Sequence, residues 1–206
     1  MAYKPQEKKC YFCGETADTR EHVPPKGFFP KEHRKDLITV NSCKTHNNHK
    51  SGDDEYFRMT LAGIAWGDLQ PSMQETIIRS VKRKPALARH IVETSKKNAT
   101  GWFTYDADSA RIDHVLECIG RGLLFHEQGK TFKEMTFFLK NFMHLNDSAP
   151  AEVIPRYRLA QEMMPDLLLE IDAKGENPSI FQYKTYKNHV QFTFYGNHLT
   201  TIAFKD

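Results

Sequence analysis

The chain has 206 residues, of which 39% are hydrophobic, and a formal net charge of +3. This size allows one buried core, or a small metal-binding module beside a medium-sized domain. A charge this small does not by itself indicate a nucleic-acid partner. Because we find no apolar run of about 20 residues and no signal peptide, we expect a soluble cytoplasmic protein without a membrane partner.

Two pairs of metal-ligand residues lie near the N-terminus. Cys10 and Cys13 are separated by two residues, and Cys43 and His46 repeat this spacing. A turn of this length directs both side chains at one ion, and Zn²⁺ favours four tetrahedral thiolate or imidazole ligands. The spacing therefore predicts a structural zinc site. Only Cys118 is left over, so we expect a buried thiol there and no disulfide framework.

The zinc ligands belong to a predicted compact unit over residues 8–58, with the order strand, turn, loop, strand, helix. Gly14 is expected to relieve the turn after Cys13. The β-branched residues of segment 36–40 favour a short strand. A helix is predicted to begin after Cys43, and a further helix begins near the acidic pair 53–54.

The remainder of the chain is typical of a helical protein that ends in strands. In chain order we predict helices over 72–84, 86–97 and 112–126, a strand over 102–105, a segment 131–145 that periodicity leaves undecided between helix and strand, and an antiparallel meander over 181–203. Within the helix 112–126, Gly122 is expected to serve helix packing, with Arg121 at the surface. The aromatic residues of the meander are expected to be core, although sheet aromatics can also stack on bases.

A basic run follows the first long helices. Between Arg79 and Lys97 the sequence has seven cations against one anion, Glu93. Such a run could follow a phosphate backbone, or it could be a solvated helix face. The residues predicted to contact nucleic acid are Lys50, Lys82, Arg83 and Lys84.

Glu21 and His22 stand between the two zinc pairs and add an acid and a base that a structural zinc does not need, which indicates an enzyme. The segment from Cys10 to Ser51 resembles the HNH endonucleases, His-Me finger nucleases whose ββα-metal fold is often stapled by zinc. It carries Cys-Tyr-Phe-Cys-Gly, then Glu-His-Val-Pro-Pro-Lys, then Cys-Lys-Thr-His-Asn-Asn-His-Lys-Ser. The resemblance implies cleavage of phosphodiester bonds, with double-stranded DNA as the expected partner.

The resemblance also assigns roles. It implies that Cys10, Cys13, Cys43 and His46 hold the structural zinc, that His22 is the general base, that Glu21 and Asn47 hold one catalytic Mg²⁺ or Mn²⁺, and that Lys50 supports the phosphate. An imidazole with a pKa near about 6.5 suits a base near neutrality, and oxygen ligands suit these cations.

Two features depart from the family pattern. The second zinc pair is Cys-His instead of Cys-Cys. The family's middle asparagine, which orients the base, has no match, because Ile38 stands in its place. Asp36, Thr39 or Asn41 could replace it.

The predicted fold class is α+β: a zinc-stapled ββα-metal module over residues 1–58, then a mainly helical region and a C-terminal antiparallel meander over 59–206. The second part is expected to position nucleic acid, form homo-oligomers or bind a regulatory protein. Two alternatives stay open. One is a zinc-stabilised nucleic-acid-binding protein without cleavage, and the other is a defence or toxin nuclease gated by a partner.

Overall fold

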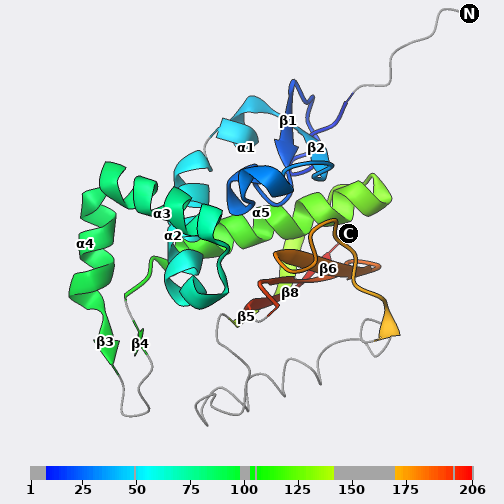
Figure 1. Ribbon diagram of the computed structural model, residues 1–206. Coiled ribbons are helices and arrows are strands. Elements are labelled where there is room, and N and C mark those ends of the chain that lie inside the picture. Colours follow the sequence, from blue (N-terminus) through cyan, green and yellow to red (C-terminus); the bar gives the residue numbers. More distant parts are fainter. Residues whose placement is uncertain are drawn as a thin grey trace, which may run out of the picture.

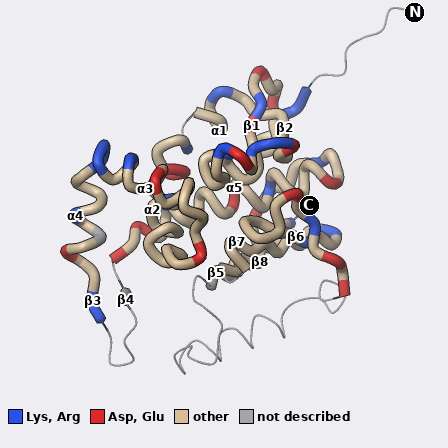
Figure 2. The backbone as a smooth tube through the Cα atoms, viewed as in Figure 1, with Lys and Arg blue, Asp and Glu red and all other residues tan. Residues whose placement is uncertain are grey.

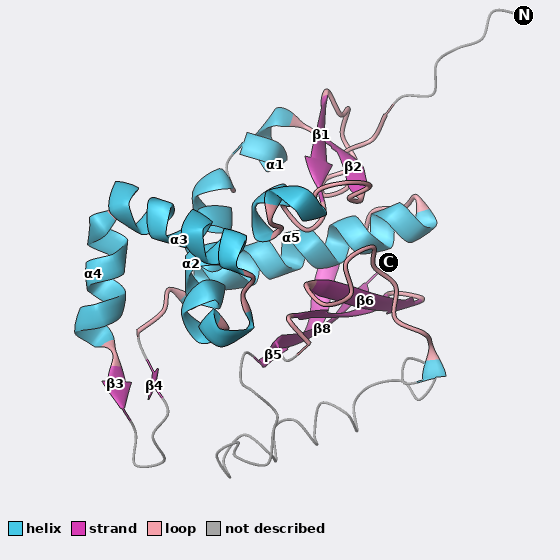
Figure 3. Cartoon of the chain, in the orientation of Figure 1, coloured by secondary structure: helices cyan, strands magenta, loops and turns pink. Residues whose placement is uncertain are grey.

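A computed structural model describes residues 8–48, 50–97, 103–104, 106–141, 170–196 and 198–205. An N-terminal hairpin with a short helix lies on one side of the long helix α5 (Ser109–Gln128), and a C-terminal antiparallel sheet lies on the other side (Figure 1). Further helices gather at one end of α5, so the chain mixes helices and sheet as predicted (Figure 3).

The hairpin pairs β1 (Thr19–His22) with β2 (Thr39–Ser42) in antiparallel register. The helix α1 (Lys44–Asn48) follows directly, so the predicted order of two strands and a helix is present. The second strand begins at Thr39, later than predicted. Asp36 explains the delay, because its φ of 56° lies in the left-handed region, which is incompatible with a strand.

The helical layer contains α2 (Ser51–Ile64), α3 (Pro71–Arg83) and α4 (Pro85–Thr94). Pro85 ends α3 and begins α4, because proline lacks the N–H needed inside a helix but fits its first turn. The helix predicted to reach Lys97 stops at Thr94. The next residues form β3 (Lys96–Lys97), which pairs with β4 (Phe103–Thr104) inside the predicted strand 102–105, whose ends lie outside the described residues. No helix of the described part is both long and apolar enough to cross a membrane.

The helix predicted over 112–126 is confirmed and extends further at both ends as α5. Asp108 caps its start by accepting a hydrogen bond from the backbone N–H of Arg111 at 3.3 Å. Gly129 ends it in the left-handed conformation, with φ of 69°. The surface position expected for Arg121 is wrong, because Arg121 is only 5% exposed and donates hydrogen bonds to the carbonyls of Phe132 and Lys133, which satisfy its buried guanidinium.

The predicted C-terminal meander is confirmed. The sheet contains β5 (Glu134–Asn141), β6 (Phe181–Tyr186), β7 (His189–Phe194) and β8 (His198–Lys205) in the order β5-β8-β7-β6, with antiparallel neighbours. The undecided segment 131–145 thus contains a strand, and its residues 142–145 lie outside the described part. Phe192 and Phe194 are at most 1% exposed, so these aromatics belong to the core.

One core joins the N-terminal part to the sheet. The ring of Phe28, from the loop after β1, lies 5.3 Å from Phe57 of α2 and 5.4 Å from Phe194 of β7, measured between ring centroids. The predicted boundary between residues 58 and 59 falls inside α2. The hairpin is therefore held in place by the rest of the chain as well as by its own contacts.

Candidate metal centre and active site

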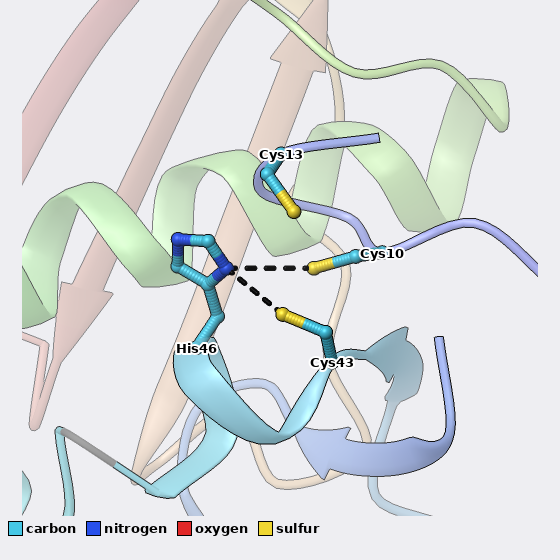
Figure 4. Close-up of side chains that lie close together, drawn as sticks. All are labelled: Cys10, Cys13, Cys43 and His46. Carbon is cyan, nitrogen blue, oxygen red and sulfur yellow. Dashed lines mark hydrogen bonds between the residues drawn. The ribbon is translucent and has the colours of Figure 1, made fainter. Parts of the chain in front are cut away.

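The four predicted zinc ligands lie together. The ligand atoms of Cys10, Cys13, Cys43 and His46 are all within 4.8 Å of one another, and the Nδ1 atom of His46 lies 3.2 Å from the Cys43 Sγ and 3.8 Å from the Cys10 Sγ (Figure 4). Zinc bonds of about 2.0–2.3 Å in tetrahedral geometry need separations of this order. The cluster could hold a zinc ion. Four protein ligands leave no position for a substrate, which is the pattern of a structural site.

The backbone around each pair explains this convergence. Gly14 has a φ of +78°, as expected for the residue that closes the turn, and its N–H donates to the Cys10 carbonyl at 2.9 Å. The N–H of Cys10 donates to the carbonyl of Glu15 at 2.7 Å. On the other side, the N–H of Asn47 donates to the Cys43 carbonyl at 3.0 Å and starts α1, which directs His46 back towards Cys43.

An aromatic and cationic stack connects the cluster to α5. The ring of Phe12 stacks on the imidazole of His46 with 4.4 Å between centroids. The buried guanidinium of Arg121 lies 4.7 Å from the Phe12 ring, within the range of a cation–π contact. The candidate zinc cluster is thereby anchored to the central helix.

Glu21 and His22 are consecutive residues of β1 and lie on opposite faces of the hairpin. Successive side chains of a strand point to opposite sides. Glu21, opposite Val40, is buried with it, whereas His22, opposite Thr39, is partly exposed. The predicted acid and base therefore do not share one face of the strand.

Glu21 forms a buried ion pair with Lys50, whose side chain is only 3% exposed. The ammonium group of Lys50 also lies 3.5 Å from an oxygen of Asp54. Burial alone would lower the pKa of Lys50, but the carboxylates of Glu21 and Asp54 raise it, so the lysine stays charged. The predicted phosphate contact by Lys50 does not fit this structure, because its charge is enclosed and neutralised.

Asn47 connects α1 to β1. Its Nδ2 atom donates to the Thr19 hydroxyl at 3.0 Å and to the Arg20 carbonyl at 3.3 Å. Glu21 faces inward to Lys50, so its carboxylate is not open to a divalent cation in this structure. The hydrogen bonds of Asn47 use its amide nitrogen and not the oxygen that would bind a cation.

His22 lies among cations. Burial lowers its pKa below its ordinary value, and the charges of Lys26, Arg20 and Arg34 lower it further. The imidazole is therefore neutral at pH 7, the form that can accept a proton. The positive surroundings would also attract an anionic substrate.

Thr39 occupies the place opposite the candidate base. It is the direct cross-strand partner of His22, and its hydroxyl accepts a hydrogen bond from Arg20. Asn41 instead pairs with Arg20, and Asp36 is an exposed residue before the strand. Of the three candidates to replace the family's middle asparagine, Thr39 is the best placed. Only strand register distinguishes it.

The predicted contacts on α3 differ from one another. Lys82 and Arg83 are exposed, whereas the ammonium group of Lys84 lies 2.5 Å from a carboxylate oxygen of Glu55. Figure 2 shows Lys and Arg both around the hairpin and near the junction of α3 and α4. The cations of the loop between β1 and β2 were missed from sequence, although Lys26, Lys31 and Arg34 follow the Glu-His pair closely.

Comparison of the chain with protein-family models, with curated proteins and with solved structures finds no match. The resemblance to the HNH endonucleases therefore rests on the motif residues and on the arrangement described above.

Proposed function

We propose that this protein is a zinc-stapled endonuclease of the HNH type that hydrolyses phosphodiester bonds, with double-stranded DNA as the substrate. The observation that carries the proposal is His22, a partly exposed and neutral imidazole that lies among Lys26, Arg20 and Arg34 on a hairpin next to a candidate zinc cluster. A general base surrounded by positive charge is the combination that phosphodiester hydrolysis requires.

In this mechanism His22 accepts the proton of the attacking water, whose oxygen bonds to phosphorus while the bond from phosphorus to the leaving sugar oxygen breaks, and the leaving oxygen takes a proton from solvent. The three cations bind the phosphate and offset the negative charge that grows on it in the transition state. Thr39 is a positioning residue, because it lies opposite His22 and fixes Arg20 through a hydrogen bond. A zinc ion held by Cys10, Cys13, Cys43 and His46 would join the turn before β1 to the start of α1, and it would take no part in the reaction because protein side chains would fill its four positions.

The Mg²⁺ or Mn²⁺ predicted at Glu21 and Asn47 finds the carboxylate of Glu21 enclosed. Glu21 is paired with the buried Lys50. The proposed mechanism therefore contains no second metal ion. The plasmid test measures whether added Mg²⁺ or Mn²⁺ changes the rate of cleavage.

The test is cleavage of supercoiled plasmid by wild type and His22→Ala, each with EDTA, Mg²⁺ or Mn²⁺, and with bound zinc quantified. His90→Ala is the matched control, because His90 is an exposed histidine of α4 outside the hairpin. We expect nicking by wild type and the control, and loss of nicking with one zinc retained in His22→Ala. Cys43→Ala should instead lose zinc and fold poorly, because metal binding contributes folding energy. Nicking by His22→Ala at the wild-type rate would exclude His22 as the base.

The buried pair of Glu21 and Lys50 favours a second candidate, a zinc-stabilised nucleic-acid-binding protein without cleavage. A catalytic acid neutralised by a buried lysine is unavailable to a metal. A partner that separates this pair would give a gated nuclease. Zinc-loaded protein that binds DNA but does not nick it with any metal would support the second candidate over the first.

A further inference from the structure

A basic groove lies between α3 and the loop that connects β1 to β2. Its cavity volume is about 430 Å³, and we call it the α3 groove. Its lining consists of five cations and one hydroxyl residue: Lys31, Arg34, Thr76, Arg79, Lys82 and Arg83. No carboxylate lines it. The groove thus combines distant parts of the sequence into one concentrated positive surface.

The two walls of the groove are fixed by structure. The hydroxyl of Ser72, in the first turn of α3, donates a hydrogen bond to Glu32 of the 3₁₀ helix Lys31–His33. On the loop side, the Nε of Arg34 donates to the Phe29 carbonyl at 2.9 Å. On the helix side, Arg79, Lys82 and Arg83 are three and four positions apart and therefore share one face.

The cations of the groove lack ion-pair partners within the described part of the chain, although the charges of Arg83 and Arg34 act on the nearby carboxylates of Glu55 and Glu32. None of its five cations forms an ion pair with a carboxylate described by the structure. Neighbouring cations behave differently, since Lys84 pairs with Glu55 and Lys50 pairs with Glu21. Like charges at these helix spacings oppose one another, so an anionic ligand would stabilise the face.

A second cavity, of about 560 Å³, lies between the hairpin and the C-terminal sheet, but its charges are mixed. Asp36 and Glu176 line it together with Arg20 and Lys174, and Lys174 already pairs with Glu127 at 2.6 Å. The α3 groove is therefore the stronger candidate for a polyanion.

The lining also indicates which polyanion fits. Single-strand binders combine cations with aromatic side chains on which bases stack. The α3 groove has no aromatic lining residue. Arginine and lysine contacts to phosphate oxygens, without stacking, are the chemistry of binding to a duplex backbone. Arg34 lines the groove and is also one of the cations whose charge lowers the pKa of His22, so the groove and the proposed active site share this side chain.

We propose that the α3 groove binds the phosphate backbone of a nucleic-acid duplex and leads it to His22. This inference rests on the proposed function. The groove supplies a sequence-independent contact, so the hairpin with His22 is brought to the backbone without reading bases.

The test measures duplex binding by fluorescence anisotropy over a salt series, in a His22→Ala background so that cleavage cannot consume the probe. The groove variant is Arg79→Gln/Lys82→Gln/Arg83→Gln. The matched control, Lys133→Gln/Lys187→Gln/Lys205→Gln, removes the same charge from exposed positions around the C-terminal sheet. Zinc content and thermal unfolding check that each protein folds. The probes are a DNA duplex, an RNA duplex and a DNA single strand of equal length.

We expect the groove variant to reduce the magnitude of the negative slope of log affinity against log salt by roughly 2 to 3 on duplex DNA, because each lost phosphate contact removes about 0.9 from that magnitude. The control should keep the wild-type slope. Equal slopes for the two variants, absence of duplex binding, or tighter binding of the single strand would overturn the proposal. Comparison of the DNA and RNA duplexes shows which of the two the groove prefers to bind.

Plasmid cleavage separates this inference from the proposed function. Nicking by the wild-type protein together with an unchanged slope in the groove variant would refute the groove and leave the nuclease intact. A reduced slope without nicking by the wild type would support the groove and refute the nuclease.

Discussion

Gly122 of α5 lies directly against Val23, the residue after His22. A Cβ atom built on Gly122 would be 2.6 Å from the Cγ2 and 3.0 Å from the Cγ1 of Val23. Val23 is 2% exposed and has little room to move. Gly122→Ala should therefore displace the end of β1, where the candidate base is located.

The size of the effect follows from two opposing terms. Overpacking in a well-packed core costs roughly 1–3 kcal/mol. Replacing glycine by alanine inside a helix returns about 1 kcal/mol. Gly122→Ala should thus lower the free energy of unfolding by up to about 2 kcal/mol. Gly63→Ala is the matched control, because nothing lies within 4 Å of its added Cβ in α2, and it should raise stability by about 0.5–1 kcal/mol.

The assay is urea unfolding of zinc-loaded protein, in which a changed midpoint at constant slope reports stability. The difference between the two alanine variants isolates the overpacking term. Val23→Ala removes both clashing methyl groups. The double variant Gly122→Ala/Val23→Ala should therefore lose less free energy of unfolding than the two single variants lose together. Gly122→Ala as stable as Gly63→Ala would refute the argument that close packing at Gly122 positions the end of β1.

Two further predictions concern charged groups. Lys50→Met leaves Glu21 as a buried carboxylate without its cation and should lower the free energy of unfolding, measured in urea at pH 7, by about 3–5 kcal/mol. The control Lys44→Met removes the cation of a surface pair and should lower it by at most about 1 kcal/mol. Equal losses in the two variants would contradict the burial argument. If His22 is the base, the nicking rate of the wild type should fall only below pH 6.5, in the acid limb of its pH profile. Burial and then the charge of Lys26 lower the pKa of His22, so the imidazole becomes protonated only below that pH. Lys26→Gln should raise that pKa and move the limb to higher pH, and a limb that stays in place would count against His22.

Much of the candidate site was predictable because it depends on local spacing. A spacing of two residues between ligands brings the side chains of Cys10 and Cys13 together, and the same spacing does so for Cys43 and His46. The amphipathic helix and the alternating C-terminal strands were also predictable, since their periods of 3.6 and 2 are properties of the sequence. The strand β5 was undecided, because it is defined by its pairing with β8 and has no clear periodicity of its own.

Other roles depended on which side chains the fold encloses. Lys50 and Arg121 are cations of a kind usually found at the surface, yet each is buried. Asp54 and Glu117, each four residues away in the sequence, supply one carboxylate to Lys50 and Arg121 respectively. The remaining partners come from other segments: Glu21 for Lys50, and the carbonyls of Phe132 and Lys133 for Arg121.

By itself, the sequence determined the candidate zinc ligands and the alternation of helices and strands, because these follow from spacings of a few residues, and its resemblance to the HNH endonucleases indicated His22 as the candidate base. Only the tertiary structure decided that Glu21 is enclosed with Lys50, that Thr39 lies opposite His22, and that Arg34 joins Arg79 in one groove. The physical reason is that strand register and long-range packing determine burial and charge pairing, and both depend on residues far apart in the chain.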